Sequence, residues 1–241
     1  MKRTCLFIVI SFLFISLSAI PPKPLRILVI TGGHDYKKEQ FNQMFESFAP
    51  DMTYQIAQLP DAYDMFMAEN RDKYDVLVFY HMWQKITDEQ KVVFADCIKK
   101  GKPLVVLHHA MCGYDNWPEY RNIIGGKYYN SPHEVDGKMV PRGTYIHDIN
   151  FNVTIADKKH PVTAGLTDFP VFDETYKGIY VDDDSKPILT TDEPSSDRVI
   201  GWVTKYGKSK ITVIELGHDA PTYENPNFRK LLRQSIEWVS R

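Results

Sequence analysis

The stretch LRILVITGGHD, residues 25–35, indicates the fold more clearly than any other part of the chain. Residues 25–30 are apolar apart from one arginine, which is typical of a strand. A pair of glycines ends this strand, and His34 comes directly after them. The apolar residues of 38–48 then recur at i, i+3, i+4 and i+7, the spacing of one helix face. This part of the chain therefore predicts a strand–turn–helix unit with polar groups at its turn.

Strand and helix patterns continue to alternate through the first half of the chain. The strand at residues 76–80 is a continuous apolar run, as expected for a parallel strand covered on both faces. Alternating strands and helices predict an α/β fold with an open, right-handed, mostly parallel sheet. We expect strands at residues 25–30, 52–58, 76–80 and 103–107, and helices at 38–48, 62–69 and 87–100.

The alternation breaks between residues 111 and 144, which are rich in Tyr, Asn and Gly. This segment predicts an insertion of loops and short elements over one edge of the sheet. A final helix follows Asn225, with Pro226 at its first position. No linker or repeat divides the chain, so we expect a single domain over residues 25–241. The later strands are expected at residues 145–155, 188–190, 199–204 and 211–216.

The N-terminus has the pattern of a secretory signal peptide. Lys2 and Arg3 precede an uncharged run of 16 residues, and the small residues Ser16 and Ser18 provide a cleavage site after residue 18. A membrane anchor is the alternative, but a spanning helix needs about 20 apolar residues. We therefore expect a signal peptide at residues 1–18, a secreted or periplasmic protein, and no membrane contact after cleavage.

Composition excludes several classes of protein. The 241 residues contain 29 Lys and Arg against 31 Asp and Glu, a net charge of −2, which argues against a nucleic-acid partner. Three cysteines are too few for a disulfide scaffold. Cys97 and Cys112 are expected at opposite ends of the strand at 103–107, too far apart to pair, so we predict two free thiols. A homo-oligomer is left open.

Histidines follow the strands of the predicted sheet. Ligands of an open parallel sheet bind outside the carboxyl ends of its strands, and histidine serves there as acid, base or metal ligand. Successive strand side chains point to opposite faces, so we expect only one of His108 and His109 to enter the site. Five of the eight histidines fall at this edge: His34, His81, His108, His109 and His218.

Three other features near this edge suggest chemistry. The pair of glycines before His34 lets the backbone turn closely beneath a ligand. Cys112 could be the thiolate nucleophile of a hydrolase, although it comes about three positions later than a nucleophile elbow requires. Asp173 and Glu174 lie two or three residues before Tyr176 in what reads as a loop. A carboxylate there could be a base with a raised pKa or could orient a histidine.

A divalent metal is compatible with the histidines, but neither the metal nor its ligands are specified by the sequence. The chain has no His-x-x-x-His and no Cys-x-x-Cys spacing. Ligands would have to converge from separate loops.

Several motifs occur in a fixed order along the chain: TGGHD (31–35), LHH (107–109), HPVTAGL (160–166), DETY (173–176), GWV (201–203), YGK (206–208), LGH (216–218), NPNFR (225–229) and Trp238. In this ordered set the chain resembles the ThuA-like (trehalose utilisation) proteins, over about residues 25–241. The resemblance implies a flavodoxin-like, doubly wound sheet of the class I glutamine amidotransferase-like type. It also implies a role in sugar utilisation beside sugar oxidoreductases, and hence substrates such as oxidised (3-keto) glycosides. Amidotransferases of this fold use a Cys–His–Glu triad, of which only His218 is in place here.

These observations lead to a hypothesis of an exported enzyme that acts on a glycoside or 3-keto-glycoside as a lyase or hydrolase. The alternatives are a non-catalytic sugar-binding protein and a Cys112-dependent hydrolase. The partner expected in each case is a small sugar. The residues expected to be catalytic are His34, His109, His218 and Glu174. Those expected to bind substrate are Gly33, Asp35, His81, Trp83, His108, Trp117, Tyr120 and Tyr176.

Overall fold

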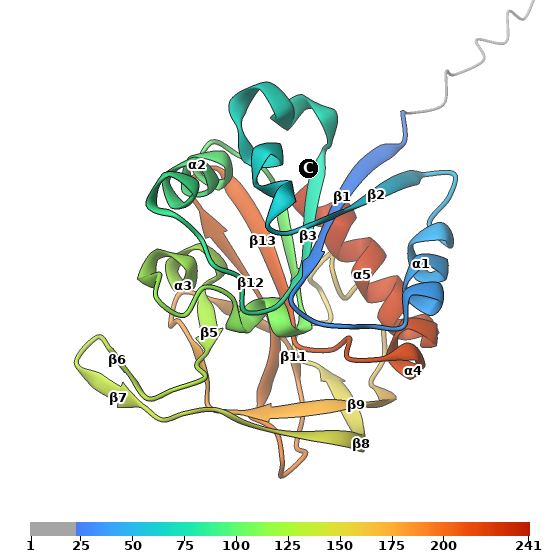
Figure 1. Cartoon of the computed structure of the whole chain (residues 1–241). Helices are drawn as coiled ribbons and strands as arrows, with labels where there is room; N and C mark the ends of the chain where they lie inside the picture. The colour runs from blue at the N-terminus through green and yellow to red at the C-terminus, as the bar shows by residue number, and fades with distance from the viewer. Residues whose placement is uncertain (1–22) are drawn as a thin grey trace, which may run out of the picture.

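A nine-stranded sheet forms the centre of the protein in the computed structural model, which describes residues 23–241 (Figure 1). The signal peptide expected at residues 1–18 lies outside the described residues. The strand order is β2-β1-β3-β4-β13-β12-β11-β8-β9. The first five strands run parallel: β1 (Leu25–Gly32), β2 (Met52–Gln58), β3 (Val76–His81), β4 (Leu104–Leu107) and β13 (Ser209–Ile214).

The other four strands extend the sheet in antiparallel fashion from β13. The order β2-β1-β3-β4-β13 is that of a flavodoxin-like doubly wound fold. The sheet is thus mixed and mostly parallel, which confirms the fold class expected from the sequence. The antiparallel strands are β12 (Val199–Tyr206), β11 (Lys186–Thr190), β8 (Thr144–Ile155) and β9 (Phe169–Lys177).

Helices cover both faces of the parallel strands (Figure 1). Along β1, Ile27 and Val29 pack into the core under α1 and α5, whereas Leu28 and Ile30 pack into the core on the other face. This burial on both faces is why residues 27–30 are all apolar. One face carries α1 (Lys38–Glu46), α4 (Ala220–Glu224) and α5 (Pro226–Val239), and the other carries α2 (Asp88–Lys99) and α3 (Pro118–Ile124).

The expected insertion after β4 consists of short elements. A 3-10 turn, η3, leads into α3, and two short strand pairs follow, one of which projects from the body of the molecule (Figure 1). The elements are η3 (His108–Cys112), β5 (Gly126–Tyr128) paired with β10 (Ile179–Val181), and the hairpin β6 (His133–Val135) and β7 (Lys138–Val140).

Two expectations about local structure are wrong. The helix expected at residues 62–69 is instead two 3-10 turns, η1 (Asp61–Phe66) and η2 (Ala68–Lys73). The loop expected around Asp173 and Glu174 is the strand β9, in which buried and exposed residues alternate at first before a run of buried ones. The capping box of Thr87 and Gln90 and the Asn225 cap are confirmed.

From β1 the chain passes to β2 on one side, and from β2 it crosses to β3 on the other side of β1, after which strands are added in that direction. The switch point of the fold therefore lies at the carboxyl ends of β1 and β3. The sequence places His34 and His81 at these ends. Among the described residues, no helix has the length and apolar character needed to cross a bilayer.

Candidate functional site

Two consecutive histidines begin the turn η3 that follows β4. His108 has a φ of +51°, a left-handed conformation that is uncommon for residues other than glycine. This kink ends the alternation of the strand, and the side chains of His108 and His109 therefore join the same cluster. Both can belong to the cluster because residue 108 already lies outside the strand. His109 nevertheless lines the site cavity described below, whereas His108 is fully buried behind it.

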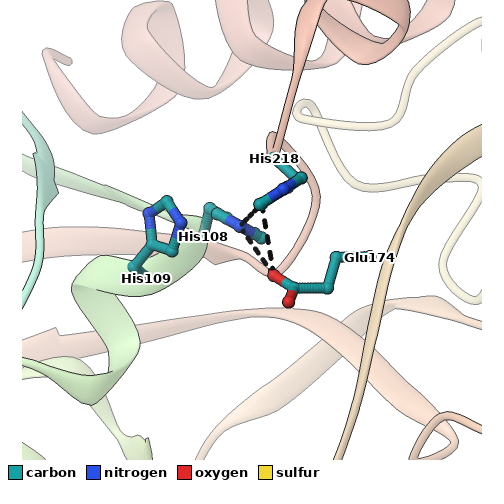
Figure 2. A group of neighbouring side chains, drawn as sticks. All are labelled: His108, His109, Glu174 and His218. Carbon is teal, nitrogen blue, oxygen red and sulfur yellow. Dashed lines mark hydrogen bonds and ion pairs between the residues drawn. The ribbon is translucent and has the colours of Figure 1, made fainter. Parts of the chain in front are cut away.

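The histidine–glutamate cluster consists of His108, His109, Glu174 and His218 (Figure 2). One ligand atom from each of these residues lies within 4.8 Å of all the others. The Nε2 atom of His108 is 3.1 Å from Nδ1 of His218 and 3.2 Å from Oε2 of Glu174. Three segments that are far apart in the sequence thus converge at the carboxyl edge of the sheet.

Neighbouring groups hold the cluster in place. His108 Nδ1 lies 2.8 Å from the Glu215 carbonyl oxygen, which can only accept a hydrogen bond, so Nδ1 carries a proton and donates it. The Tyr176 hydroxyl donates to Oε2 of Glu174. The Asp173 carboxylate accepts hydrogen bonds from the backbone N–H groups of Gly217 and His218, at 2.8 and 2.9 Å. The two acidic residues of β9 therefore have different roles. Asp173 fixes the loop after β13 that carries His218, and Glu174 contacts the histidine rings.

The charge of Glu174 shapes the protonation of the site. Burial alone would raise the pKa of Glu174, but hydrogen bonds from His108 and His218 outweigh it and hold this pKa well below its usual range. The hydrogen bond to Glu174 raises the pKa of His218. Burial lowers the pKa of His34 and, more strongly, that of His109, and the neighbouring histidines lower both further. The carboxyl group is thus ionised, rather than having the raised pKa considered from the sequence.

A cavity of about 160 Å³, here called the site cavity, opens onto the cluster. His34 lies at its wall, with its ring centroid 4.0 Å from that of His109. Tyr176, which the sequence singled out, lines it too. The other residues around the site cavity are Met82, Trp83, His109, Cys112, Tyr128, Asn130, Tyr145, His147, Glu174 and His218.

Several residues expected to bind substrate lie elsewhere. His81 and Tyr120 are fully buried, so neither has a surface for a ligand to contact in this structure. Tyr120, which the sequence analysis expected to bind substrate, instead packs its ring in the core, and its hydroxyl donates to the Ala110 carbonyl oxygen at 2.8 Å. Asp35 lines a separate cavity that shares only His34 with the site.

Gly33 and the two tryptophans lie beside the cluster. Gly33 has a φ of +81°, and a Cβ atom there would meet the Met82 carbonyl oxygen at 1.9 Å. It therefore lets the chain after β1 pack against the segment that carries Trp83. Trp83 is 60% exposed, whereas Trp117 is only 8% exposed and lies at the wall of a second cavity.

His147 belongs to the site, although the sequence gave no reason to choose it. Its Nδ1 atom is 3.2 Å from Oε1 of Glu174. It lies on β8 where the pairing with β9 shifts register between Ile146 and Ile149, and Asp148 has a φ of +60°. Such irregularities re-aim side chains next to active sites. No sequence pattern marks the bulge, so only the pairing of β8 with β9 brings His147 to the cluster.

Among known protein families, ThuA, described as trehalose utilisation, matches residues 26–239. The chain belongs to the ThuA family. A ThuA-like protein from Parabacteroides merdae is 20% identical, with a TM-score of 0.73 and coverage of 90% of both chains. One from Bacteroides uniformis is 17% identical, with a TM-score of 0.70 and coverage of 92% of this chain and 94% of that chain.

A cytoplasmic protein from Salmonella typhimurium is 14% identical, with a TM-score of 0.61 over 89% of this chain and 99% of that one. These likenesses show that the structures share a fold. Comparison with curated proteins finds no match.

The thiol of Cys112 in this ThuA protein is not set up as a nucleophile. It donates a hydrogen bond to the His109 carbonyl oxygen at 2.8 Å, and burial raises its pKa to about 12. A thiol with this pKa is protonated at neutral pH, whereas nucleophilic cysteines have lowered pKa values. Cys97 and Cys112 are both free, as expected.

The histidine–glutamate cluster fits a divalent metal ion. Both ring nitrogens of His109 are buried without a hydrogen-bond partner among residues 23–241. The Glu215 carbonyl oxygen holds the His108 ring through Nδ1, so that Nε2 faces the cluster, 3.2 Å from the Glu174 carboxylate. A second-shell bond of this kind is typical of metal-binding histidines. Imidazole and carboxylate ligands suit zinc and the neighbouring transition metals.

Proposed function

We propose that this ThuA family member is an enzyme that cleaves a glycoside or 3-keto-glycoside, as a lyase or a hydrolase. The observation that supports this most directly is the convergence of His34 and His147 with the histidine–glutamate cluster around one cavity. A purely structural role would not require so many imidazoles beside a cavity, two of them with nitrogens that have no hydrogen-bond partner in the described part of the chain. Histidines so placed can move protons at neutral pH.

The chemistry follows from a ketone at C3 of the sugar ring. The ketone acidifies the C2–H bond, and a base takes that proton while the bonding electrons form an enolate. The enolate then restores the C3 ketone, forms a C1–C2 double bond and expels the oxygen substituent at C1, which takes up a proton. Addition of water to the double bond would complete a hydrolysis. Catalysis therefore requires a base, an acid and stabilisation of the enolate oxygen.

The residues of the cavity can divide these tasks. His34 lies outside the set of candidate metal ligands and is placed to act as the base. His147 is half exposed and held by Glu174, so it is placed to protonate the leaving oxygen. His108, His109, Glu174 and His218 would hold a divalent metal, which supplies Lewis-acid stabilisation of an enolate oxygen.

The test is turnover of a panel of 3-keto disaccharides by the purified protein, with and without divalent metal ions, followed by NMR. We expect cleavage, and we expect His34→Ala to lower kcat by about 100-fold or more, the usual contribution of a general base. His133→Ala is the matched control, because His133 lies on β6 outside the cluster. Intact substrates under every condition would rule out the proposal. Saturable sugar binding without turnover, tolerant of His218→Ala, would instead identify a sugar-binding protein.

We also propose that residues 1–18 direct export. The short positive segment and the uncharged run that follows support this. Expression with the native N-terminus should yield, in the periplasmic or secreted fraction, a protein whose mass corresponds to a chain beginning at residue 19. A full-length chain retained inside the cell would contradict export.

A further inference from the structure

A second cavity adjoins the site cavity. This aromatic cavity has a volume of about 610 Å³ and lies between the segment after β3 and the segment after η3. Trp83, Cys112 and Asn130 line both cavities, so the two share a wall. A molecule bound at the histidine–glutamate cluster can therefore extend past Trp83 into the aromatic cavity.

Size indicates that the site cavity holds only part of a substrate. At about 160 Å³ it is smaller than the range of about 300–1,000 Å³ usual for small-molecule sites. The aromatic cavity, at about 610 Å³, falls within that range. Together the two provide a compartment at the reacting groups and a larger compartment beside it.

The walls of the aromatic cavity have the chemistry that a sugar ring requires. A pyranose presents apolar C–H faces and a rim of hydroxyl groups. Trp83, which is 60% exposed, and Trp117 supply aromatic surface. Asp115 and Asn130 supply polar groups and are joined by a hydrogen bond of 3.2 Å from the Asn130 amide. Aromatic surface with a few fixed polar groups is the usual composition of a site that orients a small ligand.

Backbone strain surrounds the same region. Five non-glycine residues in the described part of the chain have positive φ, and two of them, Asp136 and Asp148, belong to a hairpin turn and a strand bulge. The other three are Trp83, His108 and Tyr114, with φ of +46°, +51° and +55°. Bulky residues rarely adopt this conformation, and such strain gathers at functional sites. The two aromatic residues line the aromatic cavity, and His108 is part of the cluster.

We propose that the aromatic cavity binds the leaving sugar ring of a disaccharide substrate, with Trp83 as the platform between the two rings. This inference rests on the proposed function for the identity of the reacting ring, which occupies the site cavity. It adds to the proposed function a binding site for the ring that leaves.

The experiment compares two substrates that share the reacting ring: a 3-keto disaccharide and the corresponding methyl 3-keto-glycoside. The wild-type protein should have the higher kcat/KM for the disaccharide. Trp83→Ala should reduce this preference by about fivefold to tenfold through KM, the loss expected for one aromatic contact. Trp83→Tyr should restore most of it. Met139→Ala is the control, because Met139 is 67% exposed on β7 and lines neither cavity.

A preference for the disaccharide that survives in Trp83→Ala would overturn the inference, as would equal kcat/KM values in the wild-type protein. If neither substrate is turned over, the proposed function fails and binding decides the inference separately. A glucose disaccharide and methyl glucoside are then titrated while tryptophan fluorescence is followed. Tighter binding of the disaccharide that is lost in Trp83→Ala supports the second-ring site, and equal binding of the two sugars refutes it.

Discussion

At the scale of single residues, Gly33 links the first strand to the site. Its φ is +81°, and a Cβ atom would lie 1.9 Å from the Met82 carbonyl oxygen and 2.4 Å from Nε2 of Gln84. The Gln84 side chain itself donates to that carbonyl at 2.8 Å, so the segment around Trp83 is packed closely against the glycine. A side chain at residue 33 must displace this backbone.

We therefore expect Gly33→Ala to lower the free energy of unfolding by about 2–4 kcal/mol, as the sum of left-handed strain and overpacking. Gly137→Ala isolates the strain alone, because Gly137 has a similar φ of +76° but nothing within 4 Å of an added Cβ. It should cost about 1–2 kcal/mol. Urea denaturation of both variants checks the difference. Equal losses would show that the close approach at Gly33 carries no energetic weight.

Residue placement also shows how much of the candidate site the sequence could predict. The rule that ligands bind at the carboxyl ends of parallel strands selected His34, His109 and His218, which do converge. It also selected His81, which is buried apart from the cavity, because the rule places a residue at an edge without giving the direction of its side chain. His147 depends on a bulge in a strand pairing, which a single sequence does not encode in any readable pattern.

At the scale of elements, the sequence predicted the strands of the parallel half well, whereas it did not reveal β9. The inner strands β3 and β4 are apolar, buried runs, and the edge strand β2 agrees with its predicted range of residues 52–58 although most of its residues are at least partly exposed. The acidic pair made β9 look like a loop, since carboxylates are rare in buried strands. The structure explains them: the charge of Glu174 is compensated by histidines, and Asp173 accepts backbone hydrogen bonds.

An ion pair fastens β1 to the start of β3. Arg26 binds the Asp75 carboxylate through Nε and Nη2 at 3.0 and 2.7 Å, and its backbone N–H donates to the same group at 2.8 Å. The hydrogen bond from the Arg26 side chain is the main reason that the pKa of Asp75 lies below its usual value. Both side chains are about one-third exposed, so solvent screening limits the gain in stability.

Replacing Asp75 by Asn should cost about 1 kcal/mol at pH 7. Because the folded-state pKa of Asp75 is lowered, its contribution is present above the unfolded-state pKa and is lost as the pH falls through the folded-state value. The gap between the wild-type protein and the variant should therefore shrink below about pH 4. Denaturant titrations at pH 7 and at acid pH measure this gap. A gap that stays constant would mean that ionisation of Asp75 contributes nothing.

At the scale of the whole molecule, the histidine–glutamate cluster joins two halves of the sheet. His108 and His109 follow β4 in the parallel half, and His218 follows β13 at the junction of the halves. Glu174 lies on β9, the last strand of the antiparallel half. The same cluster that would carry the chemistry thus ties the antiparallel strands to the α/β core. A ligand bound by all four side chains would oppose separation of the two halves.

A metal ion that binds the native cluster, and not the unfolded chain, should therefore raise the thermal stability of the whole protein. At a metal concentration of 100 times Kd the gain is about 2.7 kcal/mol, which corresponds to an increase in Tm of about 5–10 °C for a protein of this size. The measurement is thermal unfolding of chelator-treated protein, before and after addition of zinc or manganese. His218→Ala and Glu174→Gln should each remove most of the metal-induced increase, whatever their own effect on Tm. His133→Ala should keep it, because His133 lies outside the cluster. An increase that persists in the cluster variants would place the metal elsewhere, and no increase with any divalent ion would show that the four side chains serve as acids, bases and hydrogen-bond partners alone.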